Sequence, residues 1–181
     1  NKEVLQWREQ RPDIIYIFSK DILRHRRAQK EDAVWLKKGE EYKDETLSVR
    51  AFGSTDVGVS FLLQASGKKI FHAGDLNNWH WMDESTEAEW KGAEKNFLHE
   101  LDDLYAYTPE VDVAMFPVDP RLGKEYMRGA GQFVTKIKTH IFVPMHFTPE
   151  YAKANAFRDF AEAHGVRFVS LTHRGQKIEI E

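Results

Sequence analysis

The sequence predicts an α/β fold in which mixed sheets are flanked by helices. Short apolar runs rich in β-formers, separated by turns, occupy its first half, whereas its second half alternates amphipathic helix patterns with apolar strands. The chain has 181 residues, of which 41% are hydrophobic, so it can bury one substantial core. No repeat, low-complexity stretch or linker interrupts it, and we expect residues 1–181 to form a single domain.

In the first half, strands are predicted over residues 14–18, 33–36, 47–52, 57–63 and 69–73. The turn-forming residues 53–56 separate the third and fourth of these strands, and residues 65–68 should form a hairpin turn between the last two. This part of the chain therefore reads as a meander.

In the second half, Thr86 and Glu89 have the spacing of a capping box that begins a long amphipathic helix. A strand is then predicted at 111–118, a helix around 125–138, a strand at 140–145, a helix at 149–164, and strands at 166–171 and 177–180. For the helix at 149–164, Thr148 is the expected N-cap, Pro149 the first residue, and Gly165 the residue just past the end.

Composition excludes several classes of protein. The 26 basic and 29 acidic residues nearly cancel to a net charge of −3, so we expect no nucleic-acid partner. The absence of cysteine rules out disulfides, thiol nucleophiles and zinc sites built from cysteine. Any metal must therefore be held by histidine and carboxylate side chains.

No apolar run approaches the roughly 18 residues of a membrane span, and residues 1–11 lack the apolar core of a signal peptide. We therefore expect a cytoplasmic protein without a membrane partner, and leave open whether it forms a homo-oligomer. Because the chain starts with Asn1 and enters a helix pattern almost at once, we interpret it as a fragment or a processed form.

Three predicted strands end on a side chain that can bind a metal: Asp75, Asp119 and His146. Functional sites in α/β sheets gather beyond the carboxyl ends of the strands, so three such endings together indicate a site. Gly74 would let the backbone beside Asp75 approach a ligand closely, and the two oxygens of Asp75 could bridge two cations. The alternative is that the aspartates form turns and that His146 is a half-buried histidine bonded to backbone.

Three segments carry a resemblance to a known family. They are Ile-Phe-His-Ala-Gly-Asp-Leu at 70–76, Val-Asp-Val-Ala-Met-Phe-Pro-Val at 111–118 and Phe-Val-Pro-Met-His-Phe at 142–147. In order and spacing they resemble the later motifs of the metallo-β-lactamase superfamily, and in particular its metal-dependent hydrolases similar to the ascorbate-6-phosphate lactonases. Asp75 matches the bridging aspartate of that family, and His146 its final histidine ligand.

The resemblance implies an αβ/βα sandwich without its N-terminal strands, a divalent cation, zinc or alternatively manganese, and a hydrolase. In that family a metal-activated water attacks an ester, lactone, amide or phosphoester of a small-molecule substrate. The family's His-x-His-x-Asp-His loop, which supplies further ligands and the residue that handles the water, is absent from this sequence, so no catalytic residue is assigned. We therefore expect the chain to be the C-terminal portion of the full fold.

The family's next histidine ligand would fall near Ser54, where Asp56 could serve as an oxygen ligand. A carboxylate in such a turn more often bonds local backbone, so both interpretations stand. For substrate binding the candidates are Asn78, His80 and Asp119. Asp119 could instead support a ligand from behind or form a turn, and the neighbouring Arg121 could face an anionic substrate.

The loop after Asp75 holds Trp79, His80 and Trp81, which could form a substrate wall, supply a third ligand, make a subunit contact or pack on the sheet. His72 should point away from Asp75 into the core. The basic cluster at residues 24–30 reads as a solvated face. As an alternative to the hydrolase, the chain could be a metal-free scaffold or binding protein, because the histidine loop is absent.

Overall fold

The computed structural model describes residues 2–25, 31 and 33–179. The basic cluster singled out at 24–30 lies largely outside these residues. The helices are α1 (Lys2–Gln10), α2 (Glu87–Tyr107), α3 (Arg128–Lys136), α4 (Tyr151–Asn155) and α5 (Arg158–Ala163), with 3₁₀ helices at Lys20–His25 and Pro120–Glu125. The strands are β1 (Ile17–Ser19), β2 (Val34–Leu36), β3 (Glu41–Lys43), β4 (Leu47–Phe52), β5 (Ser60–Ala65), β6 (Lys68–His72), β7 (Glu110–Pro117), β8 (Lys138–Met145) and β9 (Arg167–Phe168).

Seven strands form one mixed sheet in the order β3-β4-β5-β6-β7-β8-β9. The pairs from β3 to β6 are antiparallel and those from β6 to β9 are parallel. The carboxyl ends of β6, β7 and β8 therefore share one edge of the sheet. Because β5 runs opposite to β6, the loop from β4 to β5 lies at this same edge. The predicted mixed α/β fold is confirmed.

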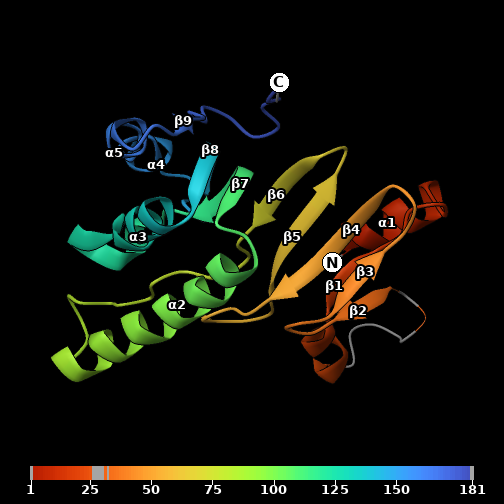
Figure 1. The fold of residues 1–181 in the computed structure, drawn as a ribbon, viewed down its shortest axis with the longest axis horizontal. Coiled ribbons are helices and arrows are strands. Elements are labelled where there is room, and N and C mark those ends of the chain that lie inside the picture. The colour runs from red at the N-terminus through yellow and green to blue at the C-terminus, as the bar shows by residue number, and fades with distance from the viewer. Residues whose placement is uncertain (1, 26–30, 32, 180–181) are drawn as a thin grey trace.

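Helices α2, α3 and α5 cover one face of the parallel strands, as Figure 1 shows. Between them lies an aromatic core in which Phe116 packs on Phe97, Phe133 and Phe142, with the Phe133 ring centroid 4.6 Å away. A much smaller cluster joins the separate parallel pair β1–β2 to β4 and β5, and its buried side chains are Leu36, Val49 and Ala51. Most of the buried apolar surface thus lies on the helix-covered side.

Local signals predicted several elements well. The strand at 47–52 is confirmed, and the Thr86–Glu89 capping box begins α2. The hairpin turn between β5 and β6 is also confirmed, with Ser66 (φ 50°) and Gly67 (φ 74°) both in the left-handed region that a type I′ turn requires. Strand β3 was not predicted, and its three residues are partly or fully exposed.

The predictions for the last third of the chain are partly wrong. The single helix expected at 149–164 is two short helices, α4 and α5, and the N-cap of the first is Glu150 rather than Thr148. Phe157, at the break between them, is fully buried against Phe142 and Phe168. Residues 177–179 do not form the predicted strand. Within the described residues, no helix combines the length and apolar character needed to cross a bilayer.

Candidate functional site

The three polar strand ends lie together at the carboxyl edge of the parallel sheet. Asp75 follows β6, Asp119 follows β7, and His146 follows β8 directly. These strands are neighbours in parallel register, so residues that are far apart in sequence meet at one edge. The structure brings all three side chains into contact.

His146 is held between the two carboxylates. Its Nε2 lies 2.9 Å from Oδ1 of Asp75, and its Nδ1 lies 3.2 Å from Oδ2 of Asp119. As hydrogen bonds, both contacts need a proton on the ring nitrogen, because a carboxylate only accepts. A metal cation between Nε2 and Asp75 would replace one of these protons and leave Nδ1–H to donate to Asp119.

The side chains of this group differ in how far they are exposed to solvent. The side chains of His146 and Asp75 are 31% and 35% exposed, so an ion or small molecule can reach them. Asp119 is only 1% exposed and lies behind His146. This arrangement agrees with Asp119 supporting His146 from behind rather than contacting a ligand itself.

Asp119 is also bound by Arg121, whose backbone N–H and guanidinium both donate to its carboxylate. Burial alone would raise the pKa of Asp119, but the hydrogen bonds from Arg121 and His146 outweigh it and hold the pKa below its ordinary value. Asp119 is therefore a carboxylate at neutral pH, able to orient His146.

Arg121 brings positive charge to a group of acids. Its side chain is 64% exposed. The hydrogen bonds to Asp119 raise the pKa of Arg121, and the negative charges of Asp56 and Asp75 add to this effect. Asp56 is exposed, and its backbone N–H donates to Ser54 Oγ at 3.3 Å, which is the local turn bonding considered in the sequence. The structure thus places Asp56 near Arg121 as well as in a turn.

Two backbone positions at the site are unusual. Gly74 has φ of 58°, and a Cβ there would lie 2.9 Å from the carbonyl oxygen of Val59, so only glycine fits before Asp75. His146 has φ of 68°, a conformation that is costly for a residue other than glycine. The strained backbone conformation thus occurs at His146, the residue that contacts both Asp75 and Asp119.

The tryptophan loop packs over the same edge. Trp79 donates its indole N–H to the backbone oxygen of Asp75 at 2.8 Å, and its ring meets His146 edge-on with centroids 5.5 Å apart. Trp81 stacks on Trp79 at 6.4 Å. The loop therefore walls one side of the Asp75–His146 pair, a role for which the sequence offered only several open alternatives.

Two candidate substrate-binding residues point into the protein. His80 is 1% exposed, its Nδ1 accepts from the N–H of Met82, and its Nε2 lies 3.1 Å from the backbone oxygen of Glu125. Asn78 is fully buried and donates to Gln132 Oε1 at 2.9 Å. In this arrangement neither side chain is available to a substrate, and both instead fix the loop.

The expectation for His72 is wrong. The residue is exposed rather than packed in the core, and its Nδ1 accepts a hydrogen bond from Gly74 N–H at 3.0 Å. Its side chain therefore belongs to the turn that leads to Asp75.

Over the described ranges, no three His, Asp or Glu side chains are grouped so as to hold one cation. Asp75 and His146 supply two converging donors, whereas a catalytic zinc site has three protein ligands. The residues fit part of a metal site. The resemblance assigns the other ligands to a motif that these 181 residues lack.

No protein-family model matches the sequence, and no curated protein matches it. Similar solved structures exist. A protein of Parabacteroides distasonis assigned as a metal-dependent hydrolase matches with a TM-score of 0.59 at 15% identity, over 87% of this chain and 64% of its own. The metallo hydrolase Igni18 of Ignicoccus hospitalis matches with a TM-score of 0.56 at 17% identity, over 93% of this chain and 70% of its own.

A third similar structure is CmlA, a diiron β-hydroxylase of Streptomyces venezuelae, with a TM-score of 0.51 at 11% identity, over 84% of this chain and 35% of its own. The chain thus spans about two thirds of the length of the first protein and about a third of the last. At these identities the likeness concerns the fold, which carries more than one chemistry. The seven-stranded mixed sheet with its flanking helices is a metallo-β-lactamase-like fold.

Proposed function

We propose that this chain carries part of the metal centre of a hydrolase, in which Asp75 and His146 bind a divalent cation. The supporting observation is the 2.9 Å contact between His146 Nε2 and Asp75 Oδ1, with Asp119 behind the imidazole. Imidazole and carboxylate suit zinc, which we take as the first expectation, with manganese as the alternative. The similar hydrolase folds are consistent with this proposal.

The chain's own residues would prepare the site. Asp119 accepts from Nδ1 of His146 and so directs Nε2 toward Asp75, as carboxylates do behind many metal-binding histidines. Trp79 fixes the backbone of Asp75 and covers one side of the pair. Asp56 is the candidate for a further oxygen ligand. A bound cation would lower the pKa of a water molecule toward about 7 and stabilise a developing oxyanion.

The substrate would be a small molecule with an ester, lactone, amide or phosphoester bond. We leave Asn78 and His80 out of the substrate contacts because both are buried. Asp119 acts through His146 in this proposal. We propose no nucleic-acid or membrane partner.

Metal analysis tests the proposal. The untagged protein is dialysed against zinc or manganese, freed of excess metal, and analysed for bound metal. We expect one or more equivalents in the wild type and a marked loss in Asp75→Ala and His146→Ala, with His164→Ala, an exposed histidine at the end of α5, as the control. Hydrolysis of an ester and phosphoester panel should follow the metal content. Equal metal content in the wild type and both site variants would contradict the proposal.

One observation favours a second candidate, a metal-free scaffold. Arg121 already supplies positive charge near Asp56, Asp75 and Asp119, as a cation would. In that case the wild-type protein binds no metal, and its free energy of unfolding is the same with added metal as without it.

A further inference from the structure

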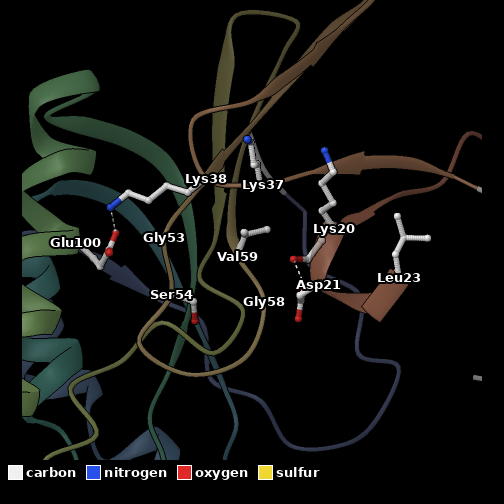
Figure 2. Close-up of a pocket in the computed structure, with 11 residues that line it drawn as sticks. Lys20, Asp21, Leu23, Lys37, Lys38, Gly53, Ser54, Gly58, Val59 and Glu100 are labelled. Atoms are coloured by element: carbon white, nitrogen blue, oxygen red, sulfur yellow. Dashed lines mark hydrogen bonds and ion pairs between the residues drawn. The ribbon is translucent and has the colours of Figure 1, made fainter. Parts of the chain in front are cut away.

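A hollow opens at the same edge of the sheet as Asp75 and His146, toward the N-terminal part of the chain (Figure 2). Its volume is about 640 Å³, within the range of pockets that bind small molecules. Its lining comes from the end of β1 and the 3₁₀ helix that follows it, from the two residues after β2 and from the loop between β4 and β5, with Glu100 contributed by α2. We call it the lysine pocket, because Lys20, Lys37 and Lys38 line it.

The three lysines are not equivalent. Lys38 is neutralised by Glu100 and Asp103, whose oxygens lie 2.7 and 2.6 Å from its Nζ. Lys37 is 67% exposed and lies 3.8 Å from Glu40, a loose pair. In Figure 2 the side chains of Lys20 and Lys37 extend in the same direction, whereas Lys38 turns to Glu100.

The lining also holds two acids, Asp21 and Glu100. Glu100 pairs with Lys38, whereas Asp21 accepts from the hydroxyl of Ser19 and keeps its negative charge. Three lysines against two acids leave the lining with a net positive charge, which favours an anion. Leu23 and Val59 supply apolar surface beside these charges, and Ser54 a hydroxyl.

The lysine pocket adjoins the Asp75–His146 pair. The carbonyl oxygen of Val59, a residue of its lining, lies against Gly74, directly before Asp75. Thr55, next to Ser54, donates to the backbone oxygen of Asn77 at 2.6 Å and accepts from its N–H at 3.0 Å. The loop between β4 and β5 thus forms one wall of the pocket and is fastened to the loop that carries Asp75.

We propose that the lysine pocket binds the anionic end of a small organic molecule, a carboxylate or phosphate on an apolar body. The ammonium groups of Lys20 and Lys37 would hold the anionic oxygens, and Leu23 and Val59 would contact the body. This assignment rests on the proposed function only in one respect: the bond to be hydrolysed would lie toward Asp75 and His146. Binding itself needs no metal.

Binding is tested with phenylphosphonate, which has no hydrolysable ester, in a buffer that contains a chelator. Calorimetry gives the affinity, and benzoate, inorganic phosphate and benzyl alcohol separate the headgroup from the apolar body. We expect Lys20→Gln combined with Lys37→Gln to weaken binding about tenfold. Lys95→Gln, an exposed lysine on α2, is the matched control and should bind as the wild type does. Added salt should weaken wild-type binding.

Amide NMR signals locate the ligand independently of the variants. Signals of Gly53, Ser54 and Gly58 should shift on titration, and those of Gly165 and Gly175, distant turn glycines, should not. No binding, binding unaltered by the double substitution, or shifts only away from the pocket would overturn the inference. The assay contains no metal, so the two proposals can fail separately. Ligand binding in a protein that takes up neither zinc nor manganese would refute the hydrolase alone, whereas metal uptake without ligand binding would refute only the pocket.

Discussion

The helix-covered strands and the antiparallel strands of the sheet are stabilised differently. Around β7 and β8, aromatic rings from the helices pack against rings of the sheet. Phe116, for example, contacts three other phenylalanines. Where β1 and β2 meet β4 and β5, the buried cluster contains only Leu36, Val49 and Ala51, with half-buried side chains around it. The first region holds Asp75, Asp119 and His146 in place, whereas the second forms the wall of the lysine pocket.

The two regions differ in how precisely they must hold their side chains. Metal ligands must be held within fractions of an ångström, which suits strand ends backed by a dense core. A pocket that attracts an anion by charge tolerates looser walls. We therefore expect substitutions in the two regions to differ in size and in their effect on metal binding.

The largest effect should come from the aromatic core. Phe116→Ala removes a fully buried ring and should lower the free energy of unfolding by about 3 to 5 kcal/mol. Leu36→Ala, in the small cluster, should cost about 2 kcal/mol, because its half-buried surroundings can close over the gap. Urea unfolding measures both. An equal or larger loss for Leu36→Ala would erase the distinction between the regions.

The turn before Asp75 should come next. Gly74→Ala combines a left-handed φ of 58° with a Cβ only 2.9 Å from the Val59 carbonyl oxygen, and we expect a loss of about 3 kcal/mol together with weaker metal binding. Gly165→Ala is the matched control, because its φ is 75° but nothing lies within 4 Å of the added Cβ. It should cost about 1 kcal/mol and leave metal binding unchanged. Similar losses in the two variants would show that the contact with Val59 is unimportant.

A smaller effect is expected at the start of α2. Thr86 accepts from the backbone N–H of Glu89, whose carboxylate accepts in turn from the N–H of Thr86. Thr86→Ala removes this cap and should cost about 1 kcal/mol, with Thr86→Ser close to the wild type. Thermal unfolding compares the three proteins, and an unchanged alanine variant would mean that the cap adds nothing to the helix-covered region.

The smallest effect concerns the turn between β3 and β4. Hydrogen bonds from the backbone and hydroxyl of Thr46 and the backbone of Leu47 lower the pKa of Asp44 from 3.8 to about 2. A carboxyl group whose pKa is lowered in the folded state stabilises the fold at every pH above its ordinary pKa. That contribution is lost as the pH falls from about 4 to about 2. Asp44→Asn should therefore show a shallower loss of stability over this range.

Glu45→Gln removes a neighbouring charge without these hydrogen bonds and serves as the control. If Asp44→Asn and the wild type lose stability in parallel between pH 4 and pH 2, Asp44 does not stabilise this edge.

Local signals in the sequence predicted the elements whose determinants lie close together. The cap of α2 depends on Thr86 and Glu89, three residues apart, and the hairpin at Ser66–Gly67 on two adjacent residues. The site at the strand ends was also predictable, because the carboxyl ends of neighbouring parallel strands share an edge. That geometry brought Asp75, Asp119 and His146 together as expected, although their role as ligands stays a prediction.

Features decided by distant partners were not predictable. The burial of His80 depends on the backbone of Glu125, and that of Asn78 on Gln132, 54 residues away. The break between α4 and α5 places Phe157 against Phe142 and Phe168, contacts that the local helix pattern does not reveal. The lysine pocket likewise joins segments separated by tens of residues.

Binding of one cation by both Asp75 and His146 can be seen directly in a crystal of the wild-type protein soaked in zinc and measured at the zinc absorption edge. We expect an anomalous peak about 2.0 to 2.2 Å from both His146 Nε2 and an oxygen of Asp75, with Nδ1 still bonded to Asp119. A crystal without a peak there, in which His146 and Asp75 keep their direct contact, would contradict this expectation.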